Sequence, residues 1–169
     1  MASPRLTELR IDAFKSVQGG RLPLGDMTLV VGRNGSGKSN ILDALTVLKA
    51  LSSGASLRDA LDGGREGVAV RGGSEGCAPV GTDSFAIGCT VSTEDGDGLN
   101  LDLEVQTVPT LQIRRERLWS PTRNGETTWL ASDPPQEYSA DIVARWNNRK
   151  RGTNPPVSLR ADQLLTSQV

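Results

Sequence analysis

The eight residues Gly32–Ser39, with the sequence GRNGSGKS, constrain the fold of this chain more than any other stretch. They match the pattern G-x-x-x-x-G-K-[ST], in which glycines let the backbone curl around phosphate oxygens and point its amides inward. A helix that follows such a loop supplies the positive end of its dipole to the bound anion. The motif therefore predicts an α/β fold of the P-loop NTPase type.

The residues around the motif have the expected patterns. The run MTLVV (27–31) is apolar without alternation, which is typical of a strand buried on both faces. From Lys38 to Leu51 apolar residues recur at helical spacing, so we expect a largely buried helix there. A short second helix is expected in SLRDALDGG (56–64), with Ser56 as N-cap and glycine just past its end.

Strand-like runs dominate the rest of the sequence. Before the motif we expect strands in 6–17 and 21–26. After residue 63, turn clusters separate further predicted strands in GVAVRGG (67–73), DSFAIGCTVST (83–93), LNLDLEVQTV (99–108), TLQIRRERLWS (110–120) and TTWLAS (127–132). The segment 137–152 is ambiguous between strand and helix, and LRADQLLTSQV (159–169) begins a helical pattern.

Composition excludes several kinds of site. The chain has no histidine and only two cysteines, Cys77 and Cys89, so a zinc set and a Ser-His-Asp or Cys-His nucleophile system are excluded. The net charge of −1 gives no general attraction to nucleic acid. The start has no apolar signal region and no run is long enough to span a bilayer, so we expect a cytoplasmic protein that binds no membrane.

The motif predicts a site for ATP and Mg²⁺. Lys38 would lie between the β- and γ-phosphates, and the Ser39 hydroxyl would bind Mg²⁺. The predicted phosphate-binding residues are Gly32, Asn34, Gly35, Ser36, Gly37, Lys38, Ser39 and Asn40.

Residues 6–51, LTELRIDAFKSV through GRNGSGKSNILDAL, resemble the amino-terminal part of SMC/RecF/OLD-type ABC ATPase heads, AAA family ATPases with a GxNGSGKSN loop. Asn34, Gly35 and Asn40 distinguish this loop from that of a kinase or GTPase. The resemblance continues more weakly through GGREGVAVRGG and LQIRRERL, which look like the β-subdomain of such heads. Within the group, the chain looks most like ATPases related to RecF and OLD proteins, which serve DNA repair and phage defence.

The resemblance implies a domain organisation. Residues 1–160 would form lobe I of an ABC ATPase, with a Walker A core in 1–62 and a mixed or antiparallel β-subdomain in about 63–135. Residues 161–169 would start a truncated helical lobe, and the C-terminal catalytic lobe would be missing. The partners would be that lobe or a second ATPase head, with ATP sandwiched in the dimer.

Catalytic residues are not expected in this chain. No run of four apolar residues precedes Asp or Glu, so Walker B is absent. LDGGR (61–65) faintly resembles an ABC signature motif, but it ends a predicted helix and lies upstream of the β-subdomain. We therefore expect ATP binding without efficient turnover until Walker B and signature motifs are supplied.

The family also implies candidates around the nucleotide. Lys15 and Ser16 follow the first strand and would pass near the nucleotide, although a solvated turn is an alternative. Arg33 could reach a phosphate or a partner, or face solvent. Gln163 is the candidate Q-loop glutamine beside Mg²⁺, with Gln106 as an alternative and a solvated glutamine as the simpler interpretation.

Other functions remain open. The basic stretches RRER (114–117) and RWNNRKR (145–151), the second with Trp146, could contact DNA, or form ordinary charged faces. The chain could also be a non-catalytic ATP-binding regulatory module for a complete ATPase head. A different small P-loop NTPase, such as a small kinase, is the third possibility.

Overall fold

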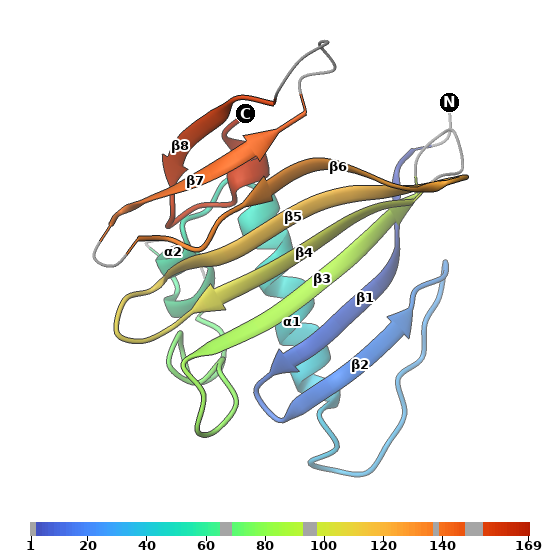
Figure 1. The fold of residues 1–169 in the computed structure, drawn as a ribbon. Helices are drawn as coiled ribbons and strands as arrows, with labels where there is room; N and C mark the ends of the chain where they lie inside the picture. The colour runs from blue at the N-terminus through green and yellow to red at the C-terminus, as the bar shows by residue number, and fades with distance from the viewer. Residues whose placement is uncertain (1–2, 65–68, 93–97, 137–138, 148–153) are drawn as a thin grey trace.

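The computed structural model describes residues 3–64, 69–92, 98–136, 139–147 and 154–169, and its strands form one sheet (Figure 1). The strand order is β2-β1-β3-β4-β5-β6-β7-β8, and every neighbouring pair is antiparallel. The strands are β1 (Arg5–Phe14), β2 (Val17–Pro23), β3 (Ser84–Ser92), β4 (Gly98–Gln106), β5 (Gln112–Thr122), β6 (Gly125–Ser132), β7 (Asp141–Trp146) and β8 (Pro156–Arg160).

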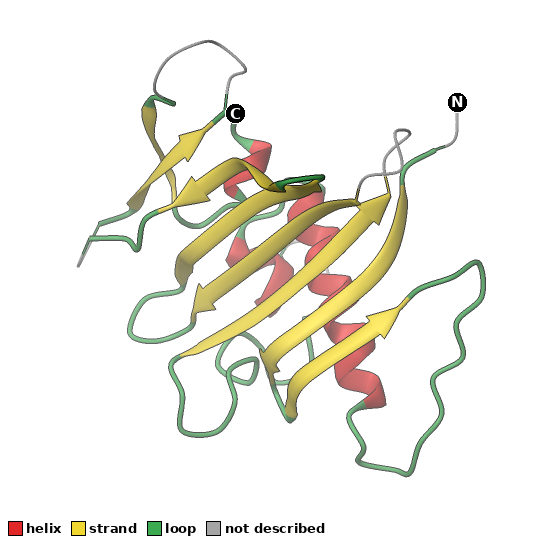
Figure 2. Ribbon diagram, turned by 45° about the vertical axis from the view of Figure 1, so that its right-hand side comes forward, coloured by secondary structure: helices red, strands yellow, loops and turns green. Residues whose placement is uncertain are grey.

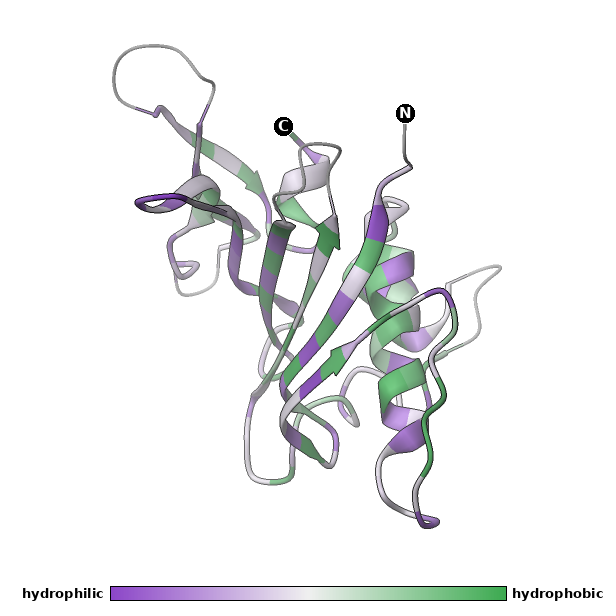
Figure 3. Cartoon of the chain, turned by 90° about the vertical axis from the view of Figure 1, so that its right-hand side faces the viewer, coloured by the Kyte–Doolittle hydropathy of each residue, from purple (hydrophilic) through white to green (hydrophobic). Residues whose placement is uncertain are grey.

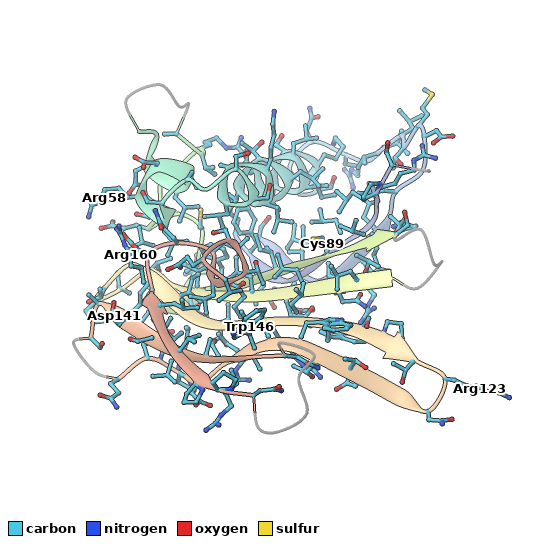
Figure 4. All side chains as sticks on the ribbon, turned by 90° about the horizontal axis from the view of Figure 1, so that it is seen from above. Arg58, Cys89, Arg123, Asp141, Trp146 and Arg160 are labelled. Atoms are coloured by element: carbon cyan, nitrogen blue, oxygen red, sulfur yellow. The ribbon has the colours of Figure 1, made fainter. Side chains whose placement is uncertain are left out.

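Two helices cover one face of this sheet, as the red ribbons behind the yellow strands show in Figure 2. They are α1 (Lys38–Ser52) and α2 (Leu57–Asp62). Figure 4 shows the same two layers from above, with Cys89 on the side of the sheet that faces the helices. The predicted caps of α2 are confirmed: the Ser56 hydroxyl accepts the amide of Asp59, and Gly63 follows the last turn.

The core lies between α1, α2 and the inner sheet face. Phe14 and Phe85 meet edge to face there, with ring centroids 5.3 Å apart. Alternate strand residues point inward, as the spacing of side chains along a strand requires. The fully buried large side chains are Phe14, Phe85, Leu9, Leu51, Leu57, Leu61, Ile87, Leu103, Ile113, Leu130, Ile142 and Leu165.

The outer sheet face carries a polar network around Arg10. Only 6% of the surface of Arg10 is exposed. Its guanidinium donates to the Asp102 carboxylate at 2.7 Å, and the Trp119 indole donates to the other oxygen of that carboxylate at 2.6 Å. Arg10 lies over Gly88, where a Cβ atom would come within 2.6 Å of the Leu101 carbonyl and 3.1 Å of Arg10 Nη2. A side chain at position 88 would therefore clash with the Leu101 carbonyl and crowd the guanidinium of Arg10.

The expected buried strand at 27–31 is wrong. This segment is a loop that begins with a bend at Met27, and Met27, Leu29 and Val31 are 87%, 77% and 78% exposed. Figure 3 shows the apolar stretch in the long loop between β2 and α1. A strand buried on both faces needs hydrogen-bonded neighbours, and among the described residues no strand pairs with this segment.

Two other predictions of secondary structure change in the fold. The described part of GVAVRGG, residues 69–73, forms loop and turn instead of a strand. The helical pattern from Leu159 is also wrong, because the chain continues as β8 to Arg160 and ends in the 3-10 helix η1 (Leu165–Ser167). The ambiguous segment 137–152 contains β7, while residues 137–138 and 148–152 lie outside the described part.

Contacts far along the chain explain why the last segment is not an α-helix. The carboxylate of Glu116 on β5 accepts the amides of Leu165 and Thr166, each at 2.7 Å. The amide of Ile113 donates to the Ala161 carbonyl at 2.6 Å. These bonds hold residues 161–166 against β5, and the amides of Leu165 and Thr166 are not available to a helix.

The predicted boundary near residue 62 does not divide the sheet. Strands β1 and β2 come before it in the sequence, and β3 after it pairs directly with β1. The helices and the strands before and after residue 62 therefore share one core.

Candidate phosphate-binding site

The loop 32–37 leads into α1 through two glycines with unusual backbone angles. Gly35 and Gly37 have φ values of 82° and 87°, in the left-handed region that favours glycine. No side chain caps α1 at its start, and its first turn contains no acidic residue. Unpaired amides at the positive end of a helix dipole bind anions. The local structure thus offers an anion site.

Gly37 is required for a second reason. A Cβ atom there would lie 2.9 Å from Val17 Cγ2 in β2. The close approach brings the β1–β2 turn against the start of α1, so the turn becomes one wall of the site.

A polar cavity of about 310 Å³ opens at this point. Its walls come from the β1–β2 turn, the loop, the first turn of α1 and the segment after α2. The lining residues are Ser16, Asn34, Gly35, Gly37, Lys38, Ser39, Asn40 and Arg71. None of these eight side chains is a carboxylate, so the cavity presents amides, hydroxyls and two cations.

Lys38 folds back over its own loop. Its ammonium donates to the carbonyls of Gly32 and Arg33, at 2.6 and 2.7 Å. The amide of Ser36 donates to the Arg33 carbonyl at 3.2 Å, which closes a turn at the tip. Gly32, Arg33 and Ser36 thus shape the loop without lining the cavity.

Arg71 is the residue that sequence reasoning missed. Its guanidinium donates to Asn40 Oδ1 at 3.2 Å, across 31 residues of sequence, and it lies on the cavity wall. The stretch around it was predicted as a strand, and no spacing relates it to the loop motif. Two bonds to the end of α2 hold its turn: Val70 N to Leu61 O at 3.0 Å and Ser74 N to Asp62 Oδ1 at 2.7 Å.

Lys15 and Ser16 lie at the same turn but have different surroundings. The Ser16 hydroxyl lines the cavity and accepts a hydrogen bond from Asn40 Nδ2 at 2.8 Å. Lys15 does not line it; its side chain is 9% exposed and its ammonium pairs with Asp43 Oδ2 at 2.5 Å. Asp43 therefore holds the lysine to α1.

The candidate Q-loop glutamines do not meet Ser39. Gln163 forms an isolated bridge with Ser56, which follows the C-terminal end of α1. That end is about 22 Å from the loop along the helix. Gln106 lies at the end of β4 and lines another cavity, of about 340 Å³, with Gln112.

Arginines of the first basic stretch pair with carboxylates, and several basic residues of the second lie outside the described part of the chain. Arg114 pairs with Asp83 and Glu104, at 3.4 and 3.6 Å. Arg117 pairs with Glu126. In the second stretch, Trp146 packs against the core (Figure 4) and residues 148–151 lie outside the described part.

The donor set suits a magnesium nucleotide better than a free metal. Among the described residues no cluster of three His, Cys, Asp or Glu side chains could hold a metal. Mg²⁺ is commonly bound by one or two protein ligands together with substrate phosphates and water. The Ser39 hydroxyl, next to Lys38 on the cavity wall, fits that role.

Cys77 lies just behind the site, and its thiol stays protonated at neutral pH. Burial raises the pKa of its thiol to about 11, the largest effect, which the Lys15 charge partly opposes. Its carbonyl accepts the Lys15 amide at 2.8 Å. The residue therefore supports the turn that carries Lys15.

Comparison with known proteins agrees with this geometry. Residues 27–161 match the family described as "AAA domain, putative AbiEii toxin, Type IV TA system", and this range includes the loop, α1 and Arg71. The chain belongs to this AAA family. The family assignment confirms the resemblance to SMC/RecF/OLD-type AAA ATPases and the P-loop α/β fold.

Two relatives of this AAA domain extend the comparison. The chain is 39% identical over 54 residues to structural maintenance of chromosomes protein 1 of Arabidopsis thaliana, and 39% identical over 51 residues to the protein of that name in Schizosaccharomyces pombe. The matches cover 31% and 29% of this chain and 4% of each relative. This AAA domain thus aligns with only a small part of these relatives.

Within the described ranges, no helix has the length and apolar character needed to cross a bilayer.

Proposed function

We propose that this chain binds ATP with Mg²⁺ in the cavity at the start of α1, as the nucleotide-binding lobe of an AAA family ATPase. The observation that carries the proposal is the set of lining groups: free helix-terminal amides, Lys38 and Arg71 converge, and no lining carboxylate opposes an anion. Charge-assisted hydrogen bonds of this kind are among the strongest available to a phosphate.

Each lining group has a role in this proposal. The loop amides cradle the phosphates, and Lys38 exchanges its two carbonyl partners for phosphate oxygens. Ser39 binds the Mg²⁺, which neutralises phosphate charge when present. Asn40 and Ser16 fix the wall on which Arg71 lies.

We further propose that hydrolysis needs a carboxylate from another lobe or a second head. Activation of water and completion of the Mg²⁺ shell normally use Asp or Glu beside the phosphates, and none of the lining residues is acidic. The exposed apolar segment 27–31 next to the loop supports a docking surface for that element.

The wider role we propose is DNA repair or phage defence. The SMC/RecF/OLD resemblance supports it, as do relatives named for the structural maintenance of chromosomes and a family described as a type IV toxin–antitoxin component. DNA would be the polymer handled by the complete assembly.

Calorimetric titration with ATP–Mg²⁺ tests the binding proposal. Lys38→Ala should weaken binding by about tenfold to a hundredfold, the value of one charged hydrogen bond. Lys49→Ala is the matched control, because Lys49 is exposed in the last turn of the same helix. Equal affinity of the Lys38→Ala variant and the wild type would refute the site.

A phosphate-release assay on the same samples tests the second part. Wild-type protein should bind ATP without appreciable release. Release that disappears in Lys38→Ala would show a complete active site in this chain, and would remove the need for a second lobe or head.

A further inference from the structure

Lys15 and Asp43 form an ion pair behind the cavity that the binding role described so far does not use. The pair is short, 2.5 Å, and mostly covered, with side chains 9% and 23% exposed. The ammonium also lies 5.6 Å from the centre of the Phe14 ring. Burying a lysine is costly unless its charge is paired and its donors have acceptors. The Asp43 carboxylate supplies the opposite charge here.

The third partner of the ammonium connects it to the cavity. Lys15 Nζ donates to the backbone carbonyl of Arg71 at 2.7 Å. The same Arg71 places its guanidinium against Asn40 Oδ1 at 3.2 Å on the cavity wall. Lys15 therefore holds the main chain of a residue that lines the cavity.

These contacts close a ring. Asn40 Nδ2 donates to Ser16 Oγ at 2.8 Å, and Ser16 is joined covalently to Lys15. Asn40 and Asp43 are three residues apart on α1, hence on one side of the helix. Five side chains (Lys15, Ser16, Asn40, Asp43 and Arg71) and the Arg71 carbonyl thus join the β1–β2 turn, α1 and the Arg71 turn to one another.

The backbone of Lys15 also contacts the Arg71 turn. Lys15 is the one non-glycine residue with positive φ among the described residues, at 54°. Its amide donates to the Cys77 carbonyl at 2.8 Å, at the other end of the Arg71 turn. The residue thus contacts the Arg71 turn with both its main chain and its side chain, in a conformation that costs free energy.

We propose that the Lys15–Asp43 pair is a positioning device that sets Arg71 toward the nucleotide phosphates, without itself touching the nucleotide. This inference rests on the proposed ATP site. Its consequence is that part of the affinity for ATP depends on residues outside the cavity. Arg71 is exposed. Without this anchor its guanidinium would be less ordered before binding, and the loss of conformational entropy on binding ATP would be larger.

Two substitutions separate positioning from simple attraction. Lys15→Met removes a positive charge near the site and Asp43→Asn removes a negative one. A direct electrostatic effect would make ATP–Mg²⁺ bind more weakly to the first variant and more tightly to the second. Positioning predicts weaker binding for both, by about three- to tenfold. Lys49→Met, on the exposed side of α1, is the control and should match the wild type.

A double-mutant cycle gives the second test. Calorimetry compares Lys15→Met, Arg71→Ala and the double variant, with thermal unfolding of each to show that it is folded. If Lys15 acts through Arg71, the double variant binds ATP–Mg²⁺ no more weakly than Arg71→Ala alone. Additive losses, or unchanged affinity in Lys15→Met, would overturn the inference. If Lys15→Met does not fold, Asp43→Asn takes its place in the cycle.

The wild-type titration separates a failure of the proposed ATP binding from a failure of the positioning role. Lack of ATP binding by the wild type refutes the proposed function, and the positioning role with it. Binding that depends on Lys38 and Arg71, but is unchanged by Lys15→Met and Asp43→Asn, refutes the positioning role alone.

Discussion

The carboxylate of Glu116 accepts the amide of Leu165 at 2.7 Å, 49 residues further along the chain. Glu116 is fully buried, and its second oxygen accepts the amide of Thr166. One acidic side chain in the core of the sheet therefore fixes the turn that follows β8.

This buried carboxylate predicts a pH dependence. Burial raises the pKa of Glu116 above its ordinary value of 4.5, while the two amides act in the opposite direction. A carboxyl whose pKa is raised by folding stabilises the fold fully below its unfolded pKa, and this contribution is lost as the pH rises through the folded pKa. Glu116→Gln cannot titrate. The free energy of unfolding of the wild type minus that of Glu116→Gln should therefore fall from about pH 4.5 upward. Denaturant titrations at several pH values measure it, and a rising difference would contradict the burial effect.

The closeness of Arg10 to Gly88 predicts a local stability cost. Gly88→Ala places a Cβ atom 2.6 Å from the Leu101 carbonyl, so strands or Arg10 must shift. We expect a loss of about 1–3 kcal/mol in the free energy of unfolding. Gly25→Ala is the control, because the nearest atom to its Cβ is 3.8 Å away. Equal denaturation midpoints for the two variants would show that the outer network adapts freely.

Gly37 and Gly54 offer a matched pair at the two ends of α1. Both have φ of 87°, but a Cβ atom meets Val17 at position 37 and nothing within 4 Å at position 54. Alanine in the left-handed region should cost each variant about 1–2 kcal/mol of stability. Only Gly37→Ala should also weaken ATP–Mg²⁺ binding, since only it disturbs the cavity wall. Calorimetry beside thermal unfolding checks both, and loss of binding in Gly54→Ala would refute the local explanation.

The exposed apolar loop predicts association. The double variant Leu29→Ser, Val31→Ser should bind less of a hydrophobic dye and self-associate less than the wild type, because exposed apolar groups drive both. Its free energy of unfolding should change by no more than about 0.5 kcal/mol, as for other surface positions. Val143→Ser, on an exposed site of β7, should leave dye binding unchanged. Unchanged dye binding in the double variant would show that the dye binds an apolar surface other than 27–31.

Local chemistry made part of this structure predictable. The loop, α1 and the Ser56 cap follow from residues within a few positions of one another, so glycine placement and helical spacing were sufficient. The strands β3 to β6 follow from alternation and turn residues in the same way.

Long-range contacts account for what the sequence did not predict. Arg71 reaches the site because Lys15, Leu61 and Asp62 hold its turn, and none of these relationships has a fixed spacing. The segment 159–169 has a helical pattern, but Glu116 takes the amides that a helix would use. The run 27–31 has strand composition, but a strand also requires a neighbour.

The contact between Arg10 and Gly88 has a consequence for the evolution of this family. We expect substitutions at the two positions to depend on each other, since a Cβ atom at 88 would lie 3.0 Å from Asp102 Oδ1 and 3.1 Å from Arg10 Nη2. Homologues that keep arginine at position 10 should keep glycine at 88, and lineages that lose one should lose the other soon after. Covariation between these two columns would record a contact on the outer face of the sheet, away from the nucleotide.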